Sequence, residues 1–151
     1  MPEYFDISFI ATKSGSSKSE MESCLNNVGL SEGENITKLF SGRRIIITMI
    51  DDETDFEELS IGLAEQIFHK ETFEKEVDEL TNFVNHCFEY NPNLKYALCS
   101  YELNGYLLGE IKKIKDFSSV FLKRFPFVYE RKGIFKPPLL QINKDAQDIF
   151  A

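Results

Sequence analysis

The chain has 151 residues and a formal net charge of −8, with 42% hydrophobic and 28% charged residues. This length is typical of one domain, and a domain of this size folds without help from a metal or a disulfide. No apolar run reaches the roughly 18 residues that a membrane span needs, and the start has no signal-peptide pattern, so we expect one cytoplasmic domain over residues 1–151.

The first predicted elements are a strand and a short helix. Residues 4–11 alternate between apolar and polar side chains, which is the pattern of a strand with one buried face. The apolar positions are Phe5, Ile7, Phe9 and Ala11. A helix is expected at about 17–28, because capping-box patterns precede it and Gly29 follows it.

Two β-hairpins are predicted, one turning at Ser41-Gly42 and one at Asn104-Gly105. Dipeptides of this kind between two β-rich runs favour tight turns. The flanking strands are residues 35–40 and 43–50 for the first turn, and residues 95–103 and 106–112 for the second. The uninterrupted run Ile45-Ile46-Ile47 predicts that its strand is central in the sheet and buried on both faces.

Residues 55–69 and 72–90 are predicted to form two helices, because apolar residues recur there every three or four positions. The stripes are Phe56, Leu59, Leu63 and Ile67 in the first helix, and Phe73, Val77, Leu80, Val84 and Cys87 in the second. One long kinked helix is the alternative, since neither Gly nor Pro separates the two. Asn91-Pro92-Asn93 ends the helical region.

The last third is predicted to contain a short helix from Asp116 through Arg124, a strand at 127–131 and a further short element from Leu139. The complete order is β-α-ββ-αα-ββ-α-β. Two hairpins imply a mostly antiparallel sheet with helices packed on it, so the predicted fold class is α+β.

The cysteines predict neither a disulfide framework nor a zinc site. Cys24, Cys87 and Cys99 are odd in number and have no C-x-x-C spacing. We expect three free thiols. Cys99 is the strongest candidate for a catalytic cysteine, although the sequence places no histidine beside it.

Two motifs resemble cofactor or metal sites, and neither is expected to bind such a group. The segment from Thr12 to Ser19 ends in Lys-Ser like a P-loop, and Asp51 follows an apolar strand, but Thr12 and Ser17 occupy the positions of the defining glycines. The acids Asp51, Asp52, Glu53 and Asp55 lack the alternating ligands and central glycine of a calcium loop. No cofactor and no metal are therefore predicted.

Charge is distributed unevenly along the chain. Residues 110–136 hold eight bases and three acids among aromatic residues, a pattern that binds single-stranded nucleic acid in some proteins. The overall negative charge and a pI of about 4.8 oppose that use. Residues 51–90 hold thirteen acids and two bases, a net charge of −11.

We expect these acids to form a docking surface for a basic protein. The residues predicted to bind this partner are Asp51, Asp52, Asp55, Glu58, Glu71, Glu74, Asp78 and Glu89. The leading hypothesis is a small inhibitor of the immunity-protein type, which neutralises a basic partner such as a nuclease toxin. The alternatives are a small enzyme that uses Cys99 or the acids of Asp51–Asp55, and a non-enzymatic adaptor or subunit of a larger complex.

Overall fold

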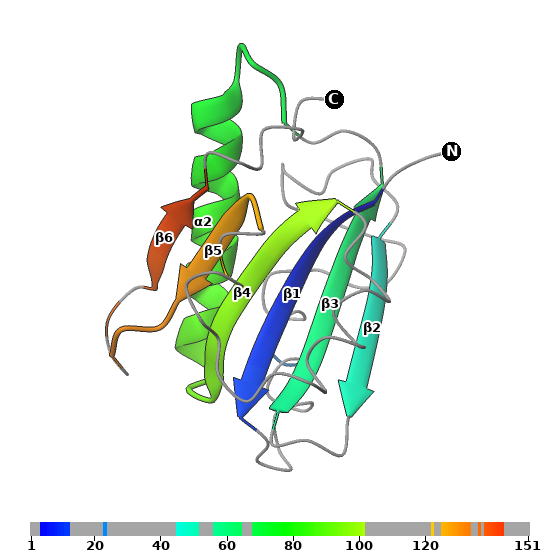
Figure 1. Ribbon diagram of the computed structural model, residues 1–151, viewed down its shortest axis with the longest axis vertical. Helices are drawn as coiled ribbons and strands as arrows, with labels where there is room; N and C mark the ends of the chain where they lie inside the picture. The colour runs from blue at the N-terminus through cyan, green and yellow to red at the C-terminus, as the bar shows by residue number, and fades with distance from the viewer. Residues whose placement is uncertain are drawn as a thin grey trace.

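The computed structural model describes residues 4–12, 23, 45–51, 56–64, 68–101, 122, 125–133, 136 and 138–143. Within these ranges the chain forms an antiparallel sheet with a helix packed on it, so the predicted α+β class is confirmed (Figure 1). The elements are β1 (Tyr4–Thr12), β2 (Ile45–Asp51), β3 (Phe56–Ala64), α2 (Phe73–Tyr90), β4 (Leu94–Tyr101), β5 (Phe127–Glu130) and β6 (Leu139–Ile142).

The strand order places β1 in the middle of the sheet. The order is β2-β3-β1-β4-β5-β6, and every neighbouring pair is antiparallel. β1 pairs with β3 on one side and with β4 on the other (Figure 1). Because successive side chains of a strand point to opposite faces, β1 contributes residues to both faces of the sheet.

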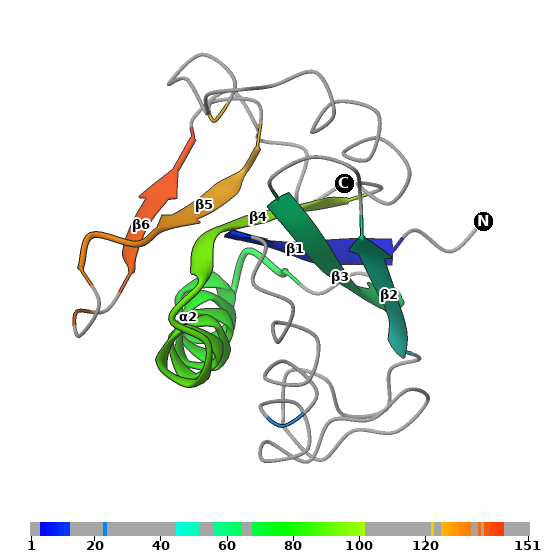
Figure 2. The same cartoon turned by 90° about the horizontal axis from the view of Figure 1, so that it is seen from below.

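α2 lies against one face of the sheet (Figure 2), and the hydrophobic core is formed between the helix and that face. Phe5, Ile7 and Phe9 of β1 are fully buried there. The ring centroid of Phe9 lies 6.2 Å from that of Phe83 and 6.3 Å from that of Phe88, which joins the strand to the helix. The α2 residues Leu80, Val84 and Cys87 belong to the same core. Burial of these apolar side chains is the main force that holds helix and sheet together.

Most of the predicted elements that fall on described residues are confirmed. The second predicted helix is α2, and its apolar stripe faces the sheet as expected. The strands predicted at 4–11, 95–103 and 127–131 correspond to β1, β4 and β5, and the element expected from Leu139 is β6. Among the described residues, no helix combines the length and the apolar character needed to cross a membrane.

The helix predicted for residues 55–69 is wrong, and so is the single long helix, because residues 56–64 form β3. The sequence there carries two patterns at once. Its apolar residues fit a helical spacing, but Leu59, Ile61 and Leu63 also alternate with polar or small residues, as in a strand. β3 is hydrogen-bonded to β1 on one edge and to β2 on the other, and this pairing outweighs the local helical pattern.

The strand containing Ile45-Ile46-Ile47 is not central in the described sheet. It is β2, the first strand in the order, and among the described strands it pairs with β3 alone. The continuous apolar run therefore did not identify the central strand of the sheet. That strand is β1, whose sequence alternates between apolar and polar residues.

The predicted turns at Ser41-Gly42 and Asn104-Gly105 lie outside the described residues and stay predictions. The described β4 pairs with β1 and β5. The helices predicted at 17–28 and 116–124 also lie outside, except for Ser23 and Leu122, which are both helical.

Arg131, the residue after β5, holds the C-terminal end of α2. Its Nε donates to the carbonyl of Leu94 at 2.6 Å, and its Nη2 donates to the carbonyls of Phe88 at 2.8 Å and Asn91 at 3.0 Å. The guanidinium also lies 4.9 Å from the centre of the Phe88 ring. The last turn of α2 has no basic residue of its own, so Arg131 supplies the cation that the negative end of the helix dipole favours.

Replacing Arg131 should therefore destabilise the domain. We expect Arg131→Ala to lower the free energy of unfolding by about 2 kcal/mol or more, because three carbonyls lose a charged donor. Urea denaturation followed by circular dichroism measures the change. The matched control is Lys132→Ala, which removes only the exposed ion pair with Glu130 and should cost under about 1 kcal/mol. Equal losses in the two variants would contradict this role for Arg131.

Candidate functional site

The exposed acids of α2 lie along one side of the helix. Glu74, Asp78 and Glu89 are exposed, and on an ideal helix their positions fall within about 60° of one another over roughly 22 Å of axis. Glu71, which is also exposed, lies in the turn just before the helix. The apolar stripe occupies the side that faces the sheet. We call Glu71, Glu74, Asp78 and Glu89 the acidic face of α2.

The acidic face of α2 has little compensating positive charge. Lys75 is the one lysine of the helix, which contains no arginine, whereas the acids are Glu74, Glu76, Asp78, Glu79 and Glu89. Within the part of the chain that the structure describes, no ion pair joins an acid of this face to a base. Glu74 and Asp78 are four residues apart and repel each other, so a bound cationic group would relieve an existing repulsion.

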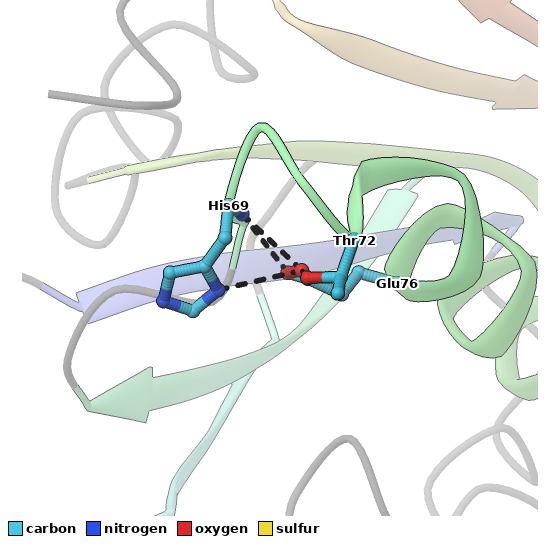
Figure 3. A network of polar contacts seen from close by, with 3 residues as sticks. All are labelled: His69, Thr72 and Glu76. Atoms are coloured by element: carbon cyan, nitrogen blue, oxygen red, sulfur yellow. Dashed lines mark hydrogen bonds and ion pairs between the residues drawn. The ribbon is translucent and has the colours of Figure 1, made fainter.

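The N-terminal end of α2 is held by Glu76, whose carboxylate points back to the preceding turn (Figure 3). The carboxylate accepts the backbone N–H of His69, at 3.2 Å to each oxygen, and lies 3.3 Å from the Nδ1 atom of His69. The hydroxyl of Thr72 donates to the same carboxylate. Glu76 is only 9% exposed, so it supports the helix and does not belong to the acidic face of α2.

The other four residues predicted to bind a partner have different positions. Asp51 ends β2, where its Cα is the register partner of Glu57. Asp52 and Asp55 lie outside the described residues. Glu58 contradicts the prediction, because it lies on β3 and is only 4% exposed. The misassigned helix placed Glu58 at the surface, whereas the strand turns its side chain into the interior.

Glu58 belongs to a group of buried polar side chains on the face of the sheet opposite α2. β1 contributes Asp6 and Ser8, and β3 contributes Glu58 and Ser60. All four side chains are buried. The Oγ atoms of Ser8 and Ser60, which are register partners, lie 3.4 Å apart. We call these four residues the buried polar patch.

Glu58 has the most unusual environment in the buried polar patch. Burial is the main reason that the pKa of Glu58 is raised from 4.5 to about 7. A hydrogen bond from Ser8 lowers this pKa, and the nearby charge of Asp6 raises it further. Among the described residues, the Oε1 atom of Glu58 has no hydrogen-bond partner. Burying an ionised and incompletely bonded carboxylate costs free energy, so the fold favours the protonated form of this side chain.

Cys99 does not have the environment of a nucleophilic thiol. It is fully buried on β4, and this burial raises the pKa of the thiol above its ordinary value of 9.0. The thiolate is the reactive form of cysteine, so Cys99 is protonated and shielded at neutral pH. Cys87 is also a buried free thiol. The part of the enzymatic hypothesis that relied on Cys99 is therefore disfavoured.

Asp6, Ser8 and Ser60 were not among the residues that the sequence predicted as functional. Alternation along β1 placed the first two opposite the apolar face, where polar residues normally meet solvent. A signal was present, because Ile10 is apolar and shares their face, as does Leu98 on β4, and both are buried. The alternation of β1 alone does not reveal that the face of the sheet opposite α2 is also covered.

Among the described residues, no three His, Cys, Asp or Glu side chains are grouped so that they could hold a metal ion. Comparison with known proteins found no matching family model, no similar curated protein and no similar solved structure. The acidic face of α2 and the buried polar patch are therefore the two features of the chain that indicate a function.

Glu58 should make stability decrease as the pH rises from 4.5 to about 7. In this window the folded state binds a proton that the unfolded chain releases, so a rise in pH favours unfolding. We expect Glu58→Gln to be more stable than the wild type at pH 8 by up to about 3 kcal/mol, and to lose that advantage below about pH 5. Urea denaturation across this pH range measures both effects. Glu79→Gln is the control and should not show this pH dependence. If the stability difference between the wild type and Glu58→Gln is independent of pH, Glu58 does not have a raised pKa.

The buried thiols should be unreactive in the folded protein. We expect a chromogenic thiol reagent to modify Cys87 and Cys99 only as the domain unfolds, because both are buried. Protein unfolded without reductant should then show three thiols per chain, Cys24 included. A count of one would instead reveal a disulfide, and rapid modification of Cys99 in the native protein would contradict its burial.

Proposed function

We propose that this protein binds a basic protein partner through the acidic face of α2. The observation that supports the proposal is the row of exposed carboxylates, which the described structure leaves without ion-pair partners. Like-charge repulsion along one helix face reduces stability. A partner that places Lys or Arg side chains against this row converts the repulsion into attraction.

Contacts at both ends of α2 hold the helix in place, so its carboxylates keep a constant arrangement. Arg131 binds carbonyls at the C-terminal end of the helix, and Glu76 binds the turn at the N-terminal end. Between the two ends the apolar stripe packs on the sheet. A helix held in three places loses little conformational freedom on binding, which lowers the entropic cost of association.

The finer form of the proposal is an inhibitor of the immunity-protein type. A nuclease toxin has a positively charged cleft for phosphates, and carboxylates spaced along a helix supply similar negative charge. Attraction between opposite charges also speeds encounter, which benefits an inhibitor that must act before its target does. An adaptor would use the same surface without blocking an activity, so an activity assay of the captured partner separates the two roles.

Charge reversal on the acidic face of α2 should slow association with the partner. The partner is first captured from a lysate of the native host and identified by mass spectrometry. We then expect Glu74→Lys with Asp78→Lys to reduce the association rate constant about tenfold or more at low salt, with a smaller effect at high salt because ions screen the attraction. Surface plasmon resonance at several salt concentrations measures this dependence.

The control for this experiment is charge reversal at two lysines of residues 110–136, Lys112→Glu with Lys113→Glu, which should leave association nearly unchanged. Circular dichroism verifies that each double variant is folded. If only the lysine variants lose the partner, the acidic face of α2 is not the docking surface. If the captured partner is acidic, the charge argument itself is wrong.

A further inference from the structure

We propose that the buried polar patch is a binding site for one organic ammonium group, such as that of a small primary amine. This inference does not rest on the proposed function, because it concerns the opposite face of the sheet. The patch combines two carboxylates and two hydroxyls, from Asp6, Glu58, Ser8 and Ser60, in the interior of the domain.

The strand register arranges these four side chains around the pair of serines. Ser8 and Ser60 are register partners, and on the same face Asp6 precedes Ser8 by two residues while Glu58 precedes Ser60 by two. Because β1 and β3 are antiparallel, the carboxylates approach the serine pair from opposite ends. The register partner of Asp6 is Gly62, which adds no side chain to this face. Small residues thus lie between two acids.

The direct indication of a ligand is the Oε1 atom of Glu58. Within the described part of the chain this buried atom has no hydrogen-bond partner, and its side chain is only 4% exposed. Buried polar atoms nearly always have a partner, and an unpartnered one calls for an explanation. A bound N–H donor would satisfy Oε1 and would offset the negative charge of the ionised Glu58 carboxylate.

An ammonium group fits this set of acceptors better than a metal ion does. A calcium or magnesium ion takes about six or more oxygen ligands in a closed shell, and the described residues contain no group of three metal-binding side chains. An ammonium has three donors and needs only hydrogen-bond distances to its acceptors. Because the patch is buried, a small free amine enters more readily than a lysine side chain of another protein.

Proton linkage gives the site a distinctive pH dependence. The ammonium binds the ionised form of Glu58, whose pKa lies at about 7, so binding should be about tenfold tighter at pH 8 than at pH 6. The other titratable residues that the strand register places on this face are Tyr4 and Asp6 on β1, Tyr96 on β4 and Glu130 on β5. Burial raises the pKa of Tyr96 above its usual value of 10.0, so Tyr96 stays neutral between these two pH values.

The experiment measures the melting temperature of the full chain with methylammonium chloride at pH 8 and pH 6. Tetramethylammonium chloride at the same concentration is the control, because it has the same charge and no N–H donor. We expect methylammonium at about five times its dissociation constant to raise the melting temperature by about 2–4 °C at pH 8. The rise should be smaller at pH 6, and tetramethylammonium should cause none.

Two variants identify the residue responsible. Glu58→Gln keeps the shape of the side chain and should abolish the response to methylammonium, whereas Glu79→Gln on α2 should keep it. The comparison of pH 8 with pH 6 in the wild type supplies a test that needs no variant. Equal responses to the two ammonium salts, no response to either, or equal responses at both pH values would overturn the proposal. A rise with calcium chloride that requires Glu58 would overturn it in favour of a metal site.

Discussion

The fold depends on the burial of both faces of β1. On one face Phe5, Ile7 and Phe9 pack against α2, and on the other Asp6 and Ser8 are buried as well. Hydrogen bonds to β3 and β4 hold the strand on both edges. With no freedom to slip by one residue, which would exchange the two faces, β1 sets the register of the strands beside it. The positions of the helix and of the buried acids follow from that register.

The acids of this protein occupy two very different environments. Those of the acidic face of α2 are in water, where charge is inexpensive and acts over a distance. Glu58 is in the interior, where an ionised form is costly and a proton or a bound cation is favoured. The first environment suits the recognition of a charged surface, and the second suits selective binding of a small group. A sequence count of acids treats both kinds alike.

α2 connects the core to the proposed docking surface. Its apolar stripe is part of the core, and its exposed side carries the carboxylates, so the residues that stabilise the helix also orient the charges. Polar contacts are added at the two ends of the helix. Arg131, outside the helix, donates to a carbonyl in its last turn, and Glu76, inside the helix, accepts from His69 in the preceding turn. Both contacts satisfy backbone groups at or beside a helix end, where internal partners are lacking. Substitutions at these supports would disturb the surface indirectly.

Local patterns in the sequence were sufficient for α2 and β1, because each has one strong period and Asn91-Pro92 marks the end of α2. They were sufficient for β4 and β5 because each lies in a short β-rich run beside a turn or proline signal, Asn104-Gly105 for β4 and Pro126 for β5. They were sufficient too for the α+β class and for the exposure of Glu74 and Asp78. The tertiary structure alone decided the state of residues 56–64, because pairing with β1 and β2 selects a strand where the apolar spacing also fits a helix. It also decided the burial of Glu58, since exposure depends on which face of β3 is covered by residues distant in the chain, and no local period carries that information.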